Sequence, residues 1–292
     1  MPRSTRILAC AAVTAAGAFL FAALPATASQ DKTPSPTVSA SGQRVSVPAY
    51  FYPGGAGAAY WDRLAGSGAA VGMAVANPAS GPGADTTANQ DYVTQLRKAD
   101  AAGVDVIGYV PTGYLGTTGL PTRSGSTAAT AWKEQVKADV DKWAGLYGDA
   151  GLDGIFLDEG LARCGPDNQY AQDYLELKTY IETELGVAAK VVANPGTGTE
   201  ECYKETADTL VTFEGDENAY RGHRPQQWEA NVPSDKIWHL VYGVPDTARA
   251  SEVVSLSRKR NAGHVYVTDD GLDNPWDTLP PAGYWDSLTG RG

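Results

Sequence analysis

Short apolar segments recur along the chain, and each of them ends in or near a Gly, Pro, Asn or Asp residue. They are rich in β-branched and aromatic residues and only a few residues long, which is typical of buried strands. The eight predicted strands are Arg44–Tyr52, Ala70–Ala76, Val104–Val110, Gly154–Asp158, Lys190–Asn194, Thr209–Glu214, Lys236–Tyr242 and Gly263–Thr268.

Most of the segments between these strands carry apolar residues at helical spacing. The predicted helices are Asn89–Ala102, Thr127–Tyr147, Asn168–Leu185 and Ala248–Arg260. Strands that alternate with helices pair in parallel through right-handed crossovers. The pattern therefore predicts an α/β fold, a (β/α)8 TIM barrel that forms a single domain over residues 45–292. A doubly wound open sheet is the main alternative, but it normally has fewer strands, and no G-x-G-x-x-G motif marks a nucleotide site.

The start of the chain has the pattern of a secretory signal peptide, predicted over residues 1–28. Arg3 and Arg6 precede a long apolar run, and an Ala-Thr-Ala site that ends at Ala28 suits signal peptidase. A membrane anchor is the alternative, but the Ala and Gly content of the run and the cleavage site favour a removed signal. Residues 29–44 are rich in Ser, Thr and Pro and predict a disordered linker. We therefore expect a secreted, extracellular protein with no stable membrane anchor.

The charge balance excludes one class of partner. The 292-residue chain has 23 Lys and Arg residues against 34 Asp and Glu residues, a formal net charge of −11. Binding to a phosphate backbone depends on clustered cationic side chains, so nucleic acid is not an expected partner. With 42% hydrophobic residues the chain can bury a sizeable core. We expect a monomer that acts without a cofactor.

Beyond the predicted cleavage site the chain holds two cysteines, Cys164 and Cys202. Each follows a predicted strand by a few residues, and an exported protein with one such pair is expected to form a disulfide between the two loops. Two unrelated buried thiols are the alternative. The chain has no C-x-x-C motif, and His223, His239 and His264 lack the spacing of metal ligands, so no metal site is predicted.

Active sites of such barrels lie at the carboxyl ends of the strands, so the acids found there are candidates for catalysis. Outward side chains of a barrel strand must be apolar to meet the helices. In the fourth strand Ile155 and Leu157 fit the outside, which turns Phe156 and Asp158 inward. Glu159 has the opposite parity, but the backbone can turn at the end of a strand and bring it to the pocket.

The sixth strand carries the second candidate. Val211 and Phe213 fit the outside, which predicts that Thr212 and Glu214 point inward. Alternate strands contribute to one layer of the barrel, so Asp158 and Glu214 are expected to share a level across the mouth.

From the fifth strand, Val192 and Asn194 are expected to point inward between these two acids. Two carboxyls that flank one bond are the minimum for most glycoside cleavage, and one of them must carry a proton. As a hypothesis, Asp158 and Glu214 are the working pair, and Glu159 tunes them or binds substrate. Which acid donates the proton stays open, and a capping role for a single acid is the alternative.

Further polar and aromatic residues near the strand ends suit a sugar, because amides bond to hydroxyls and rings stack on sugar faces. The candidate substrate-binding residues are Tyr50, Tyr52, Asn77, Tyr109, Asn194, His239, Tyr242 and Asp269, with Tyr114 as a further ring. Simple packing is the alternative for the rings, and a packed core histidine is the alternative for His239. Near the end of the chain, Trp276 is expected to belong to a closing hydrophobic plug.

Six segments at the predicted strand ends resemble the spherulin-4 (spherulation-specific family 4) pattern. They are Val47–Gly54, Ala76–Gly83, Gly108–Thr112, Gly154–Glu159, Asn194–Gly196 and Thr212–Glu214. The resemblance implies a (β/α)8 glycoside hydrolase that cleaves an α-1,4-linked galactosamine or N-acetylgalactosamine polysaccharide. It also places the family's acid pair at Asp158 and Glu159 and its further acid at Glu214. A partly deacetylated, cationic polymer would suit an acidic enzyme.

Two other functions remain as alternatives. A chitinase-like hydrolase acting on another amino-sugar polymer is disfavoured, because the D-x-D-x-E spacing is absent. A secreted carbohydrate-binding barrel without catalysis is the alternative from another class, and the acids at both strand ends argue against it. A serine hydrolase is unsupported, since no G-x-S-x-G motif occurs.

Overall fold

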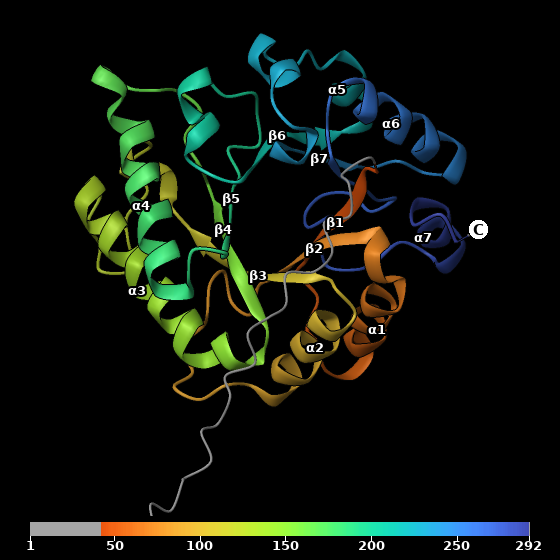
Figure 1. The fold of residues 1–292 in the computed structure, drawn as a ribbon, viewed down its shortest axis with the longest axis horizontal. Coiled ribbons are helices and arrows are strands. Elements are labelled where there is room, and N and C mark those ends of the chain that lie inside the picture. Colours follow the sequence, from red (N-terminus) through yellow and green to blue (C-terminus); the bar gives the residue numbers. More distant parts are fainter. Residues whose placement is uncertain (1–41, 292) are drawn as a thin grey trace, which may run out of the picture. The chain divides into compact units, whose positions relative to one another are not determined.

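The computed structural model describes residues 42–291, which form a closed barrel of eight parallel strands (Figure 1). Neighbouring strands pair in chain order, and the last strand pairs with the first. The strands are β1 (Arg44–Ala49), β2 (Val71–Ala76), β3 (Asp105–Pro111), β4 (Leu152–Asp158), β5 (Lys190–Ala193), β6 (Thr209–Asp216), β7 (Ile237–Tyr242) and β8 (His264–Val267). The predicted (β/α)8 barrel is confirmed.

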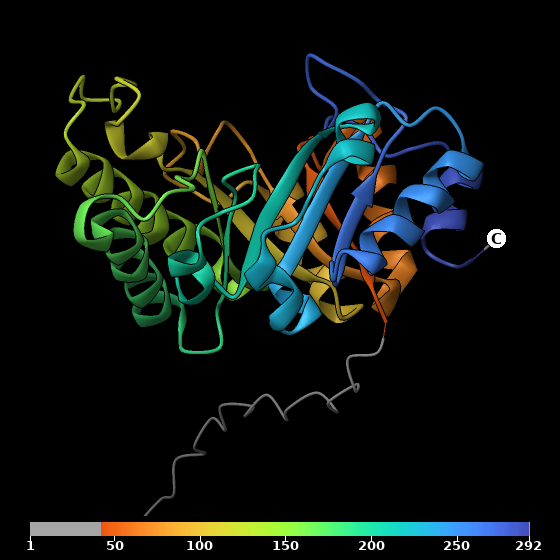
Figure 2. The same ribbon diagram turned by 90° about the horizontal axis from the view of Figure 1, so that it is seen from above.

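Helices cover the outside of the barrel, with α3 and α4 together on one flank and α6 and α7 on the other (Figures 1 and 2). The predicted helices correspond to α2 (Gln90–Ala101), α3 (Ala129–Tyr147), α4 (Gln169–Leu185) and α6 (Thr247–Lys259). Three further helices were not predicted, namely α1 (Ala58–Ser67), α5 (Glu217–Gly222) and α7 (Ala282–Leu288). They have at most 10 residues, too few for helical spacing to stand out from the surrounding loops.

The signal peptide predicted for residues 1–28 lies outside the described residues, and so does most of the linker predicted for residues 29–44. Arg44, the last residue of that predicted linker, already belongs to β1. Among the described residues, no helix has both the length and the apolar character that crossing a bilayer requires.

Aromatic rings fill the interior of the barrel below its mouth. The ring of Phe156 on β4 lies 6.2 Å from that of Tyr109 on β3 and 5.8 Å from that of Trp238 on β7. Several strands thus supply one packed layer, as is usual in this fold. Asp158 lies two positions after Phe156, so the alternation of the strand brings its side chain to the mouth above this layer.

Gly108 allows helix α3 to approach strand β3 closely. A Cβ atom at this position would lie 2.5 Å from the Trp143 ring, so any other residue would push α3 away. The indole N–H of Trp143 donates to the backbone carbonyl of Tyr109 at 2.9 Å. This contact fixes β3 at the point where Tyr109 enters the barrel.

Strand β6 departs from the predicted alternation. The register between β6 and β7 shifts between Val211 and Phe213, so Thr212 forms a bulge. Val211 pairs with the inward-facing Trp238, and the Thr212 hydroxyl donates to Glu229 in the connection that follows β6. The predicted directions of Val211 and Thr212 were therefore wrong. Beyond the bulge the strand resumes its alternation, and Glu214 points inward as predicted.

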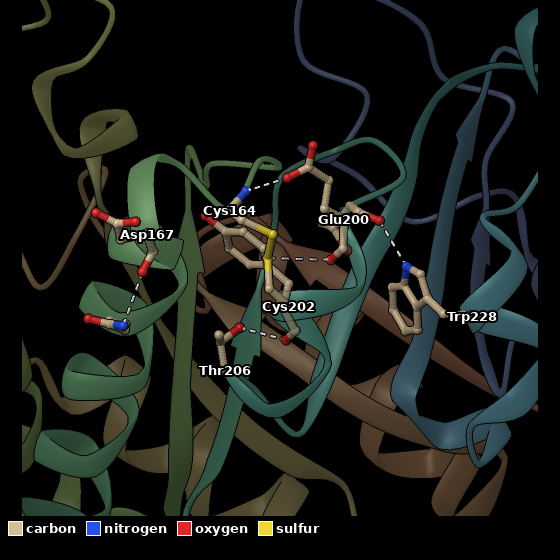
Figure 3. The surroundings of a disulfide bond; sticks show 9 residues. Cys164, Asp167, Glu200, Cys202, Thr206 and Trp228 are labelled. Carbon is tan, nitrogen blue, oxygen red and sulfur yellow. Dashed lines mark hydrogen bonds between the residues drawn. A yellow bond between two sulfur atoms is a disulfide. The ribbon is translucent and has the colours of Figure 1, made fainter.

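A disulfide joins two loops beside the barrel mouth (Figure 3). Cys164 follows β4 and Cys202 lies in a short 3-10 segment after β5, with a Cα–Cα distance of 6.0 Å. The backbone N–H of Cys164 also donates to Glu200 Oε2 at 2.7 Å. The predicted disulfide is confirmed, and it fastens the two loops that follow the strands of Asp158 and Asn194.

Candidate active site

The side-chain amide of Asn194, directly after β5, links two carboxylates on the neighbouring strands. Its Nδ2 donates to Asp158 Oδ1 and to Glu214 Oε2, each at 2.8 Å. Its Oδ1 accepts a hydrogen bond from the backbone N–H of Gly196 at 2.9 Å, which determines which end of the amide faces the acids. The two bonded carboxylate oxygens are therefore at most twice 2.8 Å, or 5.6 Å, apart.

Asp158, at the end of β4, receives hydrogen bonds from three donors. Besides Asn194, the Tyr109 hydroxyl and the backbone N–H of Glu159 donate to its carboxylate. Burial raises the pKa of Asp158 above its ordinary value, and the three hydrogen bonds oppose this rise because they favour the ionised form. The surroundings of Asp158 are thus arranged to hold a carboxylate in a buried position.

Two effects favour the protonated form of Glu214, which lies on β6. Burial raises its pKa, and the nearby charge of Asp158 raises it further. Hydrogen bonds from Asn194 and from the indole N–H of Trp276, the latter at 3.3 Å, oppose the rise. Repulsion between the two close carboxylates is mutual, so it opposes their being ionised at the same time.

Glu159 reaches the pocket through an unusual backbone conformation. Its φ of +54° lies in the left-handed region, which a residue with a Cβ adopts at a cost and which often marks functional sites. The Thr112 hydroxyl and the Tyr114 N–H both bond to its backbone carbonyl, at 2.8 Å each, and hold this turn. The backbone N–H of Gly113 donates to its carboxylate at 3.1 Å, while burial and the charge of Asp158 raise its pKa. The turn thus brings a third carboxylate beside the pair.

These acids line a pocket of about 430 Å³ at the barrel mouth. Its walls come from the segments that follow β3 and β5, from the ends of β4, β6 and β7, and from the loop after β8. The lining residues are Tyr114, Asp158, Glu159, Asn194, Pro195, Gly196, Glu214, Tyr242, Leu272, Asp273, Asn274, Pro275 and Trp276. Among these described residues there are four acids and no Lys, Arg or His, so the pocket is strongly negative when the acids are ionised.

Comparison with known proteins identifies the family. The model of spherulation-specific family 4 matches residues 44–290. Spherulin-4 of Physarum polycephalum is 32% identical over 237 residues, which is 77% of this chain and 63% of that protein. The chain belongs to spherulation-specific family 4. It spans less than two thirds of the length of this curated relative.

Solved structures share the barrel of this family member. Aspergillus clavatus Sph3, solved in complex with GalNAc, superposes with a TM-score of 0.67 at 22% identity, covering 86% of this chain and 99% of that one. A chitinase of Chromobacterium violaceum gives a TM-score of 0.51 at 13% identity and covers 84% of this chain and 98% of its own. At these identities the likeness shows a common fold.

Five of the residues expected to bind substrate lie in or below the pocket of this spherulation-specific family 4 barrel. Asn194, Tyr242 and Tyr114 line it, and the Tyr242 ring lies 6.1 Å from that of Trp276. Tyr109 lies beneath, bonded to Asp158. The Tyr50 ring packs edge-on against Tyr109 at 5.6 Å, and burial, followed by the charge of Asp158, raises the pKa of the Tyr50 phenol.

Three of the expected substrate-binding residues lie at the same end of the fold but outside the pocket lining. The Tyr52 hydroxyl donates to Asp91 at 2.7 Å at the start of α2. Asn77 Oδ1 accepts from the Gly81 N–H at 3.1 Å and closes a turn after β2. Asp269 is exposed and lines a separate hollow beside Arg63. The structure therefore does not bring these three side chains to the acids.

His239 is corrected from a substrate contact to a packed residue outside the barrel. Trp238 and Leu240 flank it on β7 and belong to the main core, so His239 faces the opposite side of the strand. It is fully buried there, and its ring lies 5.5 Å from those of Tyr220 and His223. Neither the acids nor any other lining residue of the pocket is among these contacts.

The segment of the loop after β8 that lines the pocket, Leu272–Trp276, was not among the predicted site residues. Trp276 was expected in a hydrophobic plug. It is 5% exposed and packs against Tyr266 at 5.8 Å, as a plug would, but its indole N–H also reaches Glu214. The signal that could have identified it is its place in the loop after the eighth strand, because such loops build the active sites of these barrels.

Proposed function

We propose that this protein is a secreted glycoside hydrolase that cleaves an α-1,4-linked polysaccharide containing galactosamine or N-acetylgalactosamine. The proposal is carried by one observation, the pair of carboxylates of Asp158 and Glu214 that share the amide of Asn194 in an open pocket. Membership in spherulation-specific family 4 and the GalNAc bound to the related Sph3 barrel support the choice of sugar. The disulfide supports a location outside the cell, where such bonds persist.

Glu214 is the proposed proton donor and Asp158 the proposed nucleophile. A raised pKa lets Glu214 protonate the glycosidic oxygen as the bond to the anomeric carbon breaks. Asp158, held as a carboxylate by its three donors, forms a bond to that carbon and gives a glycosyl-enzyme. Ionised Glu214 then takes a proton from water, which displaces Asp158 and regenerates both groups.

The spacing of the acids favours retention of configuration. Retaining glycosidases hold their carboxyls about 5–5.5 Å apart, and inverting enzymes about 6.5–9.5 Å apart, because a water must fit between acid and sugar. The bonded oxygens of Asp158 and Glu214 are at most 5.6 Å apart. A pair that shares one amide donor at this spacing lies nearer the range of retaining enzymes than that of inverting enzymes.

The charge of the pocket supports an amino sugar. Four acids and no cationic side chain line it, and the whole chain has a formal net charge of −11. A free amine is protonated at neutral pH and is attracted to such a pocket. Partly deacetylated polymers are therefore the proposed substrates.

The test is release of reducing ends from α-1,4-linked galactosamine oligosaccharides, both acetylated and free, with chitin oligosaccharides for comparison. Glu214→Gln and Asp158→Asn should each lower the rate by about 10²–10⁴-fold, the usual worth of such groups. Glu134→Gln removes an equal charge from the exposed surface of α3 and should keep the wild-type rate. Binding of these sugars without any product would instead favour a carbohydrate-binding barrel.

A further inference from the structure

Outside the barrel, the connection between β6 and β7 brings together two histidines and a glutamate. His223 and Glu229 lie in this connection, and His239 lies on the outer side of β7. Each of the three residues offers one side-chain atom that could bind a metal, and these three atoms all lie within 4.8 Å of one another. The two imidazole rings stand nearly perpendicular, with their centroids 5.5 Å apart.

The Nε2 atoms of both histidines are buried without a partner. Each is shielded from solvent, and neither has a hydrogen-bond partner among the described residues. Such orphaned polar atoms are costly, and each one calls for an explanation. His239 is fully buried and its Nδ1 is bonded to the Tyr220 hydroxyl at 2.8 Å, which leaves its Nε2 free to bind something else.

We propose that His223, Glu229 and His239 form a binding site for one divalent transition-metal ion, best suited to Zn²⁺. Imidazole nitrogen and carboxylate oxygen are ligands that zinc prefers, and three protein ligands with a fourth open position are a common zinc arrangement. Zn–N distances of about 2.0–2.1 Å and tetrahedral angles place two imidazole centroids roughly 5 Å apart. The observed 5.5 Å is close to this spacing.

The neighbours of the cluster match what metal ligands need. A ligating histidine usually bonds through its second ring nitrogen to a polar group that fixes its orientation, and Tyr220 has that position against His239. Glu229 accepts from the Gln226 N–H at 2.8 Å and from Thr212 at 2.9 Å, which holds its carboxylate in place. Both carboxylate oxygens keep a second lone pair for an ion.

A cationic side chain, that of Arg260, lies beside the cluster. The Arg260 guanidinium is held 4.5 Å over the Tyr220 ring and donates to the His223 carbonyl at 2.8 Å. Its charge opposes a cation, and the Glu229 carboxylate offsets it.

With three protein ligands the fourth position would be left to water, and the ion would link two elements of the fold. The ion would tie the connection between β6 and β7 to the outer face of β7, just beyond the bulge at Thr212. We therefore expect the folded protein to be more stable when zinc is bound, since a ligand that prefers the folded state stabilises that state.

The experiment is titration of the metal-free, disulfide-bonded chain with ZnCl₂ by calorimetry, followed by thermal unfolding with and without zinc. We expect one Zn²⁺ per chain, a higher unfolding midpoint with zinc, and tetrahedral visible absorption when Co²⁺ replaces it. His223→Gln should weaken zinc binding at least tenfold, because it removes one ligand. Arg224→Gln changes the exposed neighbouring residue and should bind zinc as the wild type does.

No bound zinc in the wild type would overturn the proposal, and so would wild-type affinity in His223→Gln. Equal loss in His223→Gln and Arg224→Gln would overturn it as well, because a general disturbance of the segment would then explain the effect. The Co²⁺ spectrum is measured on the wild type, so it tests the site even where a variant fails to fold. An octahedral spectrum would contradict the proposed ligand set.

Discussion

The indole N–H of Trp276 donates to Glu214 Oε1 at 3.3 Å, so the loop after β8 contacts an acid on β6. This bond favours the ionised form of Glu214 and holds its pKa down. Trp276→Phe removes the donor and keeps an aromatic ring, so the pKa of Glu214 should rise. If Glu214 is the proton donor, the alkaline limb of the kcat profile should move to higher pH, measured by initial rates across the pH range. Tyr242→Phe, on the same wall, should leave this limb in place.

Tyr109→Phe tests the other acid. Loss of the hydroxyl removes one of three donors to the Asp158 carboxylate, so the pKa of Asp158 should rise. A nucleophile must be ionised, so the acidic limb of kcat/KM should move to higher pH while the alkaline limb stays. The ring keeps its packing against Tyr50 and Phe156, and the thermal unfolding midpoint should change little. A shift of the alkaline limb alone would reverse the roles of Asp158 and Glu214.

Asn194→Ala removes the amide that the two acids share. Both carboxylates lose a donor, and the loss of a positioned hydrogen-bond donor in a site of this kind costs about 10²–10³-fold in kcat. Steady-state rates on the same oligosaccharides measure the effect. Asn77→Ala removes an amide from a turn outside the pocket and should retain activity. Equal rates in Asn194→Ala and the wild type would show that the bridge has no part in catalysis.

Replacing Cys164 and Cys202 together by Ser should destabilise the protein without abolishing its chemistry. The bond closes a loop with a sequence separation of 38 residues. The chain-entropy relation gives about 4 kcal/mol of stability for a loop of this length, and loss of a native disulfide typically costs about 2–5 kcal/mol. Chemical denaturation of both forms measures the difference, and the reduced wild type is the matched control. A double variant as stable as the oxidised protein would contradict this expectation.

The sequence was sufficient to predict the barrel and its acids, because both follow from regular alternation. Strand β4 has a register shift at its start, at Asp153, but pairs regularly with β3 from Gly154 to Asp158, so the parity of Ile155 to Asp158 gave the direction of each side chain correctly. Strand β6 contains a bulge that its sequence does not reveal, since Val211, Thr212 and Phe213 alternate as in any regular strand. Glu214 was still placed correctly because its outward neighbour Phe213 lies beyond the bulge.

Residues in loops were harder to place, because no period fixes the direction of their side chains. Trp276 was expected to pack, and its bond to Glu214 depends on the path of the loop after β8. Glu159 reaches the pocket only through a left-handed turn that Gly113 and Thr112 complete from another strand end. The contribution of Trp276 and Glu159 to the site therefore depends on how the loops and strand ends come together at the barrel mouth.

The histidines illustrate a different limit. His223 and His239 lie too far apart in sequence to show metal-ligand spacing, and they meet because the connection after α5 folds back along β7. The spacing of residues in the sequence can identify metal ligands that lie on one element or one hairpin. It cannot identify metal ligands that come together only when a longer connection folds back on the barrel.

The stereochemistry of the first product tests the central claim most directly. Proton NMR of the wild-type enzyme in D₂O, recorded within the first minutes of cleaving an α-1,4-linked galactosamine oligosaccharide, shows the anomer released before it equilibrates. A carboxylate pair at the short spacing of Asp158 and Glu214 predicts the α-anomer first, with retained configuration. Release of the β-anomer first would contradict the proposed pair and its roles.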